Sequence, residues 1–176
     1  MPEAASERRA FAPWIAAWAI AGVVLLLIQA LYRLTPRALE PLREGTLSGF
    51  HLALYVGFFL FSLYAEGYRG FQKAFVPRTV ARAFHLSQNP SPLSVLFAPA
   101  YAMALLHAKP RRLVVSWVIF VTVTLCVIFV RFLPPTYRSI IDAGVVGGLS
   151  WGLFSLLHCS VQAFRGDVPS VVMDLP

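Results

Sequence analysis

Residues 140–163, IIDAGVVGGLSWGLFSLLHCSVQA, form an apolar run that is long enough to cross a bilayer as a helix. At 3.6 residues per turn, three glycines and a serine follow one line along this helix. A line of small side chains lets another helix backbone approach closely, which is one way in which membrane helices associate. We therefore predict that the other helices pack on this face, through Gly144, Gly148, Gly152 and Ser155.

The composition places the chain among membrane proteins. Of its 176 residues 58% are hydrophobic, and its mean hydropathy is +0.69. Soluble domains contain about 45–50% apolar residues. Inside a bilayer only helices and closed barrels satisfy their backbone hydrogen bonds, and the sequence lacks the alternating pattern of a barrel. The sequence therefore predicts an all-α, multi-pass helical bundle that forms one membrane domain, residues 1–176.

Four apolar runs are predicted to span the membrane. They cover residues 13–34, 47–66, 113–132 and 140–163. The predicted connections are a polar N-terminal tail at 1–12, a basic amphipathic loop at 67–92 and a tail at 164–176. Within that loop, Pro77 favours a short helix that ends near Leu86.

A fifth hydrophobic segment, residues 93–108, has no certain place in this scheme. Pro99 interrupts it, and as a helix it would reach only about 24 Å. It could span the membrane, lie at the interface or form a re-entrant arm. We favour the arm, because with four spans the face that carries both termini holds 10 of the 15 cationic residues. The positive-inside rule then places the N-terminus in the cytoplasm, whereas five spans give no bias.

The net charge of +7 comes from cations in short loops between apolar runs. This pattern indicates contact with anionic lipid headgroups and not with nucleic acid. The residues that we expect at the headgroups are Arg69, Lys73, Arg78 and Arg82. The pattern is similar in a general way to small polytopic proteins of bacteria, so we expect the chain in a cell inner membrane.

The remaining polar residues near the ends of the spans sort into two layers. The candidate inner-face polar site contains Glu66, Arg69, His107 and His158, and the candidate outer-face polar site contains His51, Arg131 and Asp142. Ionisable groups inside a membrane suggest a function. Near helix ends, however, long side chains reach the interface at little cost.

Metal or haem binding is the sharpest hypothesis for the inner layer. Glu66, His107 and His158 would supply a carboxylate and two imidazoles. The sequence contains no HxxxH, ExxH or CxxCH motif, and Cys126 and Cys159 lie in separate apolar runs. We therefore predict no cofactor.

The sequence also lacks GxSxG, P-loop and GxGxxG motifs, and no second carboxylate lies near Glu66. We predict a non-enzymatic subunit or scaffold that binds a membrane partner or anionic lipid, as a homo-oligomer or with another membrane protein. One alternative is a transporter of small molecules or ions that acts as an oligomer. The other is an intramembrane enzyme, or a haem- or metal-binding protein, that uses the inner-face His and Glu residues.

Overall fold

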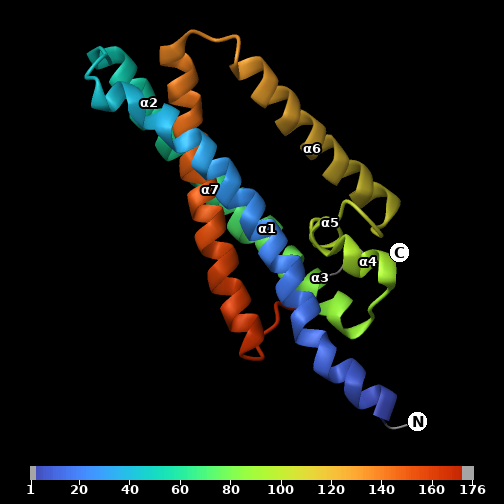
Figure 1. Cartoon of the computed structure of the whole chain (residues 1–176). Coiled ribbons are helices and arrows are strands. Elements are labelled where there is room, and N and C mark those ends of the chain that lie inside the picture. Colours follow the sequence, from blue (N-terminus) through green and yellow to red (C-terminus); the bar gives the residue numbers. More distant parts are fainter. Residues whose placement is uncertain (1–2, 172–176) are drawn as a thin grey trace. The chain divides into compact units, whose positions relative to one another are not determined.

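The computed structural model describes the backbone of residues 3–171 and the side chains of residues 13–171. The ends of the predicted tails, residues 1–2 and 172–176, lie outside the described residues. Between residues 3 and 171 every regular element is a helix (Figure 1). In chain order the elements are α1 (Glu3–Arg43), α2 (Gly49–Ser62), the π-helix η1 (Leu63–Phe75), α3 (Val76–Gln88), α4 (Pro92–Leu96), α5 (Ala98–Ala102), α6 (Pro110–Val130) and α7 (Pro135–Phe164).

Four helical stretches are long and apolar enough to cross a membrane. They are Pro13–Arg43, Gly49–Gln88, Pro110–Val130 and Pro135–Phe164. This confirms an all-helical protein with four membrane-length helices. The segment 93–108 is not among them, because it folds as the two five-residue helices α4 and α5.

Three segments predicted to lie outside the spans are helical in the structure: residues 3–12 and 35–43 belong to α1, and residues 67–88 belong to η1 and α3. The predicted break after Leu34 is wrong, because α1 continues to Arg43. Residues 67–88 of the predicted loop continue α2 through η1 and α3, and α3 begins at the turn that holds Pro77. Tertiary packing explains the longer α1, since Ala38 is buried and its carbonyl accepts a hydrogen bond from Tyr55 Oη at 2.9 Å.

The chain packs as two compact units. The first contains the described residues up to Leu25, then Phe75–Val118 and the residues from Leu156 on; the second contains Leu26–Ala74 and Ile119–Ser155. In the first unit α1 and α3 pack on the short helix α5. Its buried core consists of Ile15, Ala16, Ala19, Ile20, Ala83, Leu86, Ala98, Tyr101 and Ala102.

Arg82 holds the segment after α5 against α3. Its side chain is only 2% exposed, and it donates hydrogen bonds from Nε to Tyr101 O at 2.8 Å and from Nη2 to Leu106 O at 2.9 Å and His107 O at 3.0 Å. The guanidinium also lies 4.5 Å from the centre of the Tyr101 ring. The carbonyls of Leu106 and His107 belong to a stretch in which Ala104 and His107 have positive φ, so no regular helix satisfies them, whereas Tyr101 O also accepts from Ala104 N at 3.0 Å.

This position corrects the sequence-based assignment of Arg82 to the headgroup surface. The amphipathic pattern places Arg82 on the basic side of α3, and that side is covered by α5 and the turn that follows it. A fork of N–H donors is well suited to several carbonyls at once. Arg82 therefore acts as an internal cap for the short-helix segment.

Tyr101 links this cap to a histidine. The Tyr101 hydroxyl lies 3.3 Å from His85 Nδ1. Burial raises the pKa of Tyr101, and the nearby Arg82 charge opposes this shift in part. The Tyr101 hydroxyl is therefore neutral at physiological pH and can take part in this hydrogen bond.

We expect Arg82→Met to loosen residues 98–108. The variant removes the side-chain donor from the carbonyls of Leu106 and His107, and it leaves Tyr101 O with only the Ala104 N–H as donor. At about 1–3 kcal/mol for each buried carbonyl without a donor, we expect a loss of roughly 3 kcal/mol of stability. Hydrogen exchange of the amides at 103–108 should become faster. Arg82→Lys should not restore protection, because an ammonium lacks the fork geometry. The control is Arg78→Met, one turn earlier on α3; an equal effect there would contradict the capping role.

Candidate functional site: the glycine face of α7

The glycines of α7 lie against α2 and η1 in the second unit. A Cβ added to Gly144 would lie 2.5 Å from Cε1 of Phe58 and 2.7 Å from Oγ of Ser62. At Gly152 it would lie 2.6 Å from Cγ of Phe71. These distances leave no room for a side chain, so the glycine line receives the side chains of the neighbouring helix.

Glycines that the sequence analysis did not select contribute to the same contact. A Cβ at Gly147 would lie 2.8 Å from Cε2 of Phe59, and a Cβ at Gly67 would lie 2.8 Å from Cβ of Trp151. Thus a glycine of η1, Gly67, also packs against a large side chain of α7, that of Trp151. Nε1 of the same Trp151 donates a hydrogen bond to Gln72 Oε1 at 2.7 Å. The GxxxG spacing on α7 is visible in the sequence, whereas Gly67, which contacts Trp151, lies in the segment 67–92 that is predicted to be a loop.

The π-helical form of η1 keeps one face of this helix on α7. In an α-helix, Glu66 and Phe71 would lie about 140° apart around the axis. Hydrogen bonds in a π-helix span five residues, so a turn takes about 4.4 residues and the same two positions lie roughly 50° apart. This explains how Ser62, Gly67 and Phe71 all contact the glycine face.

Local sequence favours this unusual helix. Gly67 and Gly70 give the η1 backbone freedom, and η1 ends at Phe75, two residues before Pro77. A proline inside an α-helix has no N–H and clashes with the carbonyl four residues earlier, here that of Lys73. Wider turns before the proline leave this carbonyl more room.

Glu66 and Ser62 are the polar groups of the contact. A Cβ at Gly148 would lie 3.0 Å from Glu66 Oε2 and 3.6 Å from the backbone oxygen of Ser62. Ser62 is fully buried, and no residue in the described part of the chain forms a hydrogen bond with its Oγ. Ser155 is also buried, one turn beyond Gly152. Besides the Trp151–Gln72 hydrogen bond and Ser155, the contact therefore contains a carboxylate and a hydroxyl about one turn apart.

The predicted inner-face residues do not form one cluster. Glu66 and Arg69 belong to the second unit, whereas His107 and His158 belong to the first. His107 is exposed in the turn after α5, and its carbonyl accepts from Arg82. His158 is exposed on α7. Among residues 13–171 no group of three His, Cys, Asp or Glu side chains is placed to hold a metal ion.

The predicted outer-face residues have separate local partners. His51 Nδ1 lies 2.8 Å from Ser48 Oγ at the start of α2, and its ring packs edge-on against Tyr137. Asp142 is 5% exposed, and its Oδ2 lies 3.9 Å from Nε of Arg138 one turn earlier on α7. Arg131 is exposed directly after the end of α6.

The side chains of the three other predicted headgroup residues are exposed at least in part. Arg69 and Lys73 are exposed and Arg78 is half-buried. Lys73 Nζ lies 4.5 Å above the ring of Tyr68, which stacks on Tyr64 with ring centres 5.8 Å apart. Aromatic and basic side chains of this kind are typical of a membrane–water interface, so headgroup binding by these residues stays a prediction.

The fold and the contact define a class, an all-helical protein whose four long apolar helices suit a membrane. Comparison with protein-family models, with curated proteins and with solved structures finds no match.

We expect Gly144→Ala to destabilise the protein. The new methyl group would overlap the Phe58 ring and force it or α7 to move, which typically costs about 1–3 kcal/mol. The thermal unfolding midpoint in detergent, followed by near-UV circular dichroism, should fall. Gly49→Ala is the matched control, because nothing lies within 4 Å of a Cβ at that position. Equal midpoints for the two variants would show that the glycine face tolerates side chains.

Proposed function

We propose that the chain is a subunit of a membrane assembly and that it pairs with a second copy of itself through an apolar groove on α2. This proposal keeps the subunit role expected from the sequence but moves the contact surface. The glycine face of α7 is filled by Phe58, Phe71 and their neighbours from the same chain. A partner must therefore use another surface.

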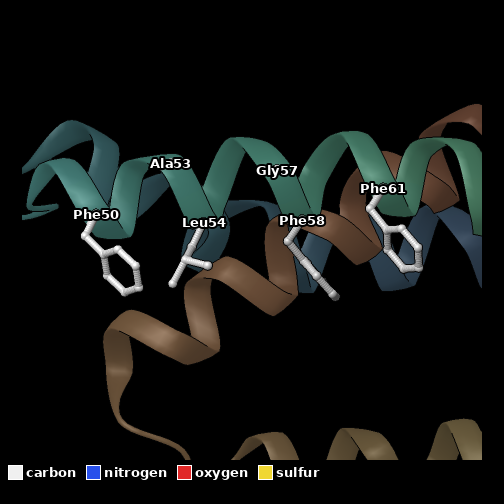
Figure 2. Close-up of a pocket in the computed structure, with 6 residues that line it drawn as sticks. All are labelled: Phe50, Ala53, Leu54, Gly57, Phe58 and Phe61. Atoms are coloured by element: carbon white, nitrogen blue, oxygen red, sulfur yellow. The ribbon is translucent and has the colours of Figure 1, made fainter.

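The groove on α2 supports this proposal. It has a volume of about 410 Å³, and its lining residues are Phe50, Ala53, Leu54, Gly57, Phe58 and Phe61. In Figure 2 the side chains of Phe50, Leu54, Phe58 and Phe61 project from the same side of α2, and Ala53 and Gly57 lie between them. The groove therefore has a floor of small residues and walls of large apolar ones.

Gly57 is the observation that carries the proposal. A glycine inside a helix costs about 1 kcal/mol relative to alanine. At Gly144 and Gly152 the chain itself uses the space that the glycine leaves, whereas nothing in the described chain lies within 4 Å of a Cβ at Gly57. Ala53 and Gly57 are four residues apart, the small-xxx-small spacing through which membrane helices approach one another.

A second copy fits the groove because one face offers both halves of a contact. Gly57 leaves space in which a large side chain of a second copy can pack. The rings of Phe50 and Phe61 are 69% and 63% exposed, so they can fill the same space on that second copy. Most soluble homo-oligomers, and glycophorin-like membrane dimers, use the same patch on both copies.

We expect Gly57→Leu to weaken self-association about tenfold or more, which corresponds to ~1.4 kcal/mol. The leucine fills the space that the partner helix needs. The measurement is energy transfer between donor- and acceptor-tagged copies in liposomes at several protein-to-lipid ratios, with native mass spectrometry of the 19.5 kDa chain as a second readout.

The control for this experiment is Val56→Leu. Val56 is 48% exposed on α2, outside the groove, and the change also enlarges an apolar side chain. It should leave the energy transfer unchanged. A wild-type chain that stays monomeric at every ratio, or a Gly57→Leu chain that associates like the wild type, would refute the pairing through α2.

A further inference from the structure

The contact that Glu66 makes places this residue at the middle of α7. If a Cβ were added to Gly148, it would lie 3.0 Å from Oε2 and 3.1 Å from Cβ of Glu66. Gly148 lies 13 residues after Pro135 and 16 residues before Phe164, the two ends of α7. At 1.5 Å per residue it is about 20 Å from one end and about 24 Å from the other. A hydrocarbon layer is about 30 Å thick, so the middle of a membrane-crossing α7 lies deep inside it.

This depth differs from the one expected from the sequence. The predicted second span ends at Glu66, which would place the carboxylate at the membrane edge. In the structure the helix continues past Glu66 for 22 residues to Gln88. A glutamate side chain is too short to reach the interface from the middle of α7, so snorkelling does not explain its presence.

Glu66 has no ion-pair partner in the described part of the chain, although the cation Arg69 lies three residues further along its own helix. On its own helix the nearest cations are Arg69 and Lys73, which are exposed. Along α7 the nearest titratable groups on either side of Gly148 are Asp142, which faces Arg138, and His158. An isolated carboxylate in hydrocarbon is so costly that such a group takes up a proton.

Ser62 provides an independent observation at the same place. Its hydroxyl is 0% exposed and has no hydrogen-bond partner among the described residues, and such a group in a native structure calls for an explanation. Ser62 lies one turn before Glu66, and both side chains face the glycines of α7. The Ser62 hydroxyl can donate to the Glu66 carboxylate directly or through one water, and it can accept from the carboxylic acid.

We propose that Glu66 is a proton-binding site at the middle of the membrane and that the Ser62 hydroxyl tunes its proton affinity. One proton from water adds to a carboxylate oxygen of Glu66 and leaves by the same route, and no other reactant is needed. The short helix–helix contact holds the carboxyl in place, because Gly148 leaves room for it and a larger residue would not. This inference does not depend on the pairing of copies through α2.

Chemical labelling of the wild-type chain tests the proposal. Dicyclohexylcarbodiimide enters hydrocarbon and reacts with a protonated carboxyl group, whose proton moves to a nitrogen while its oxygen adds to the central carbon. The full chain is reconstituted in vesicles of phosphatidylcholine and phosphatidylglycerol, treated over a range of pH, and labelled glutamates are located by peptide mass spectrometry. Glu44, in the turn after α1, is the internal control because it is exposed outside the long helices.

We expect Glu66 to be labelled several-fold more than Glu44 at neutral pH. Labelling should fall about tenfold per pH unit once the site releases its proton. Glu66→Gln should abolish the label without changing the circular dichroism spectrum. Equal labelling of Glu66 and Glu44 would overturn the proposal, and suppression of the label by Na⁺ at constant pH would replace the proton by a metal cation as the ligand.

The role of Ser62 has its own readout. Removal of a hydroxyl that donates to the carboxylate disfavours the charged form, so in Ser62→Ala the pH profile of labelling at Glu66 should move to higher pH. Ser155→Ala, which removes another buried hydroxyl from the second unit, should leave the profile in place. A Ser62→Ala profile that coincides with the wild type would exclude Ser62 from the site.

Discussion

The close contact between α7 and the α2–η1 helix is the constraint on which the second unit depends. A membrane interior offers little hydrophobic gain for packing two apolar helices, because lipid tails are as apolar as the side chains. Association then comes from many short van der Waals contacts, which require backbones to approach closely. Glycines at 144, 147, 148 and 152 on α7 and at 67 on η1 make this approach possible. Each is matched by a large side chain from the opposite helix, so the two surfaces interlock.

The same contact explains the irregular helix geometry. An α-helix would rotate Phe71 away from the face that carries Ser62 and Glu66, and the glycine at 152 would lose its partner. The π-helical turns restore the alignment. Long π-helices are rare because their hydrogen-bond geometry and packing are poorer, so this one must be supported by the contacts that it makes with α7. It also brings the ionisable side chain of Glu66 against Gly148 of α7.

In the first unit the main constraint is to supply hydrogen-bond partners for the backbone groups of two short helices. Helices α4 and α5 have five residues each, so most of their backbone groups have no partner inside the helix. Arg82 satisfies three carbonyls of α5 and the turn that follows, and its charge is stabilised by the Tyr101 ring. Helix α6 differs from these short helices because Ser116 is its only buried residue. Such exposure suits a helix whose apolar side chains are covered by lipid.

The sequence by itself determined the class of the protein, the four membrane-length helices and the start of α3 near Pro77, because run length, hydropathy and proline are local properties of the chain. The spacing of the α7 glycines was also visible. Tertiary structure alone decided which residues face them, since a 3.6-residue period cannot anticipate a π-helix whose register depends on α7. It also decided the burial of Arg82, which depends on carbonyls 19 to 25 residues away. It also placed Glu66 against Gly148, in the middle of α7, because a contact between two helices is not a local property of either segment.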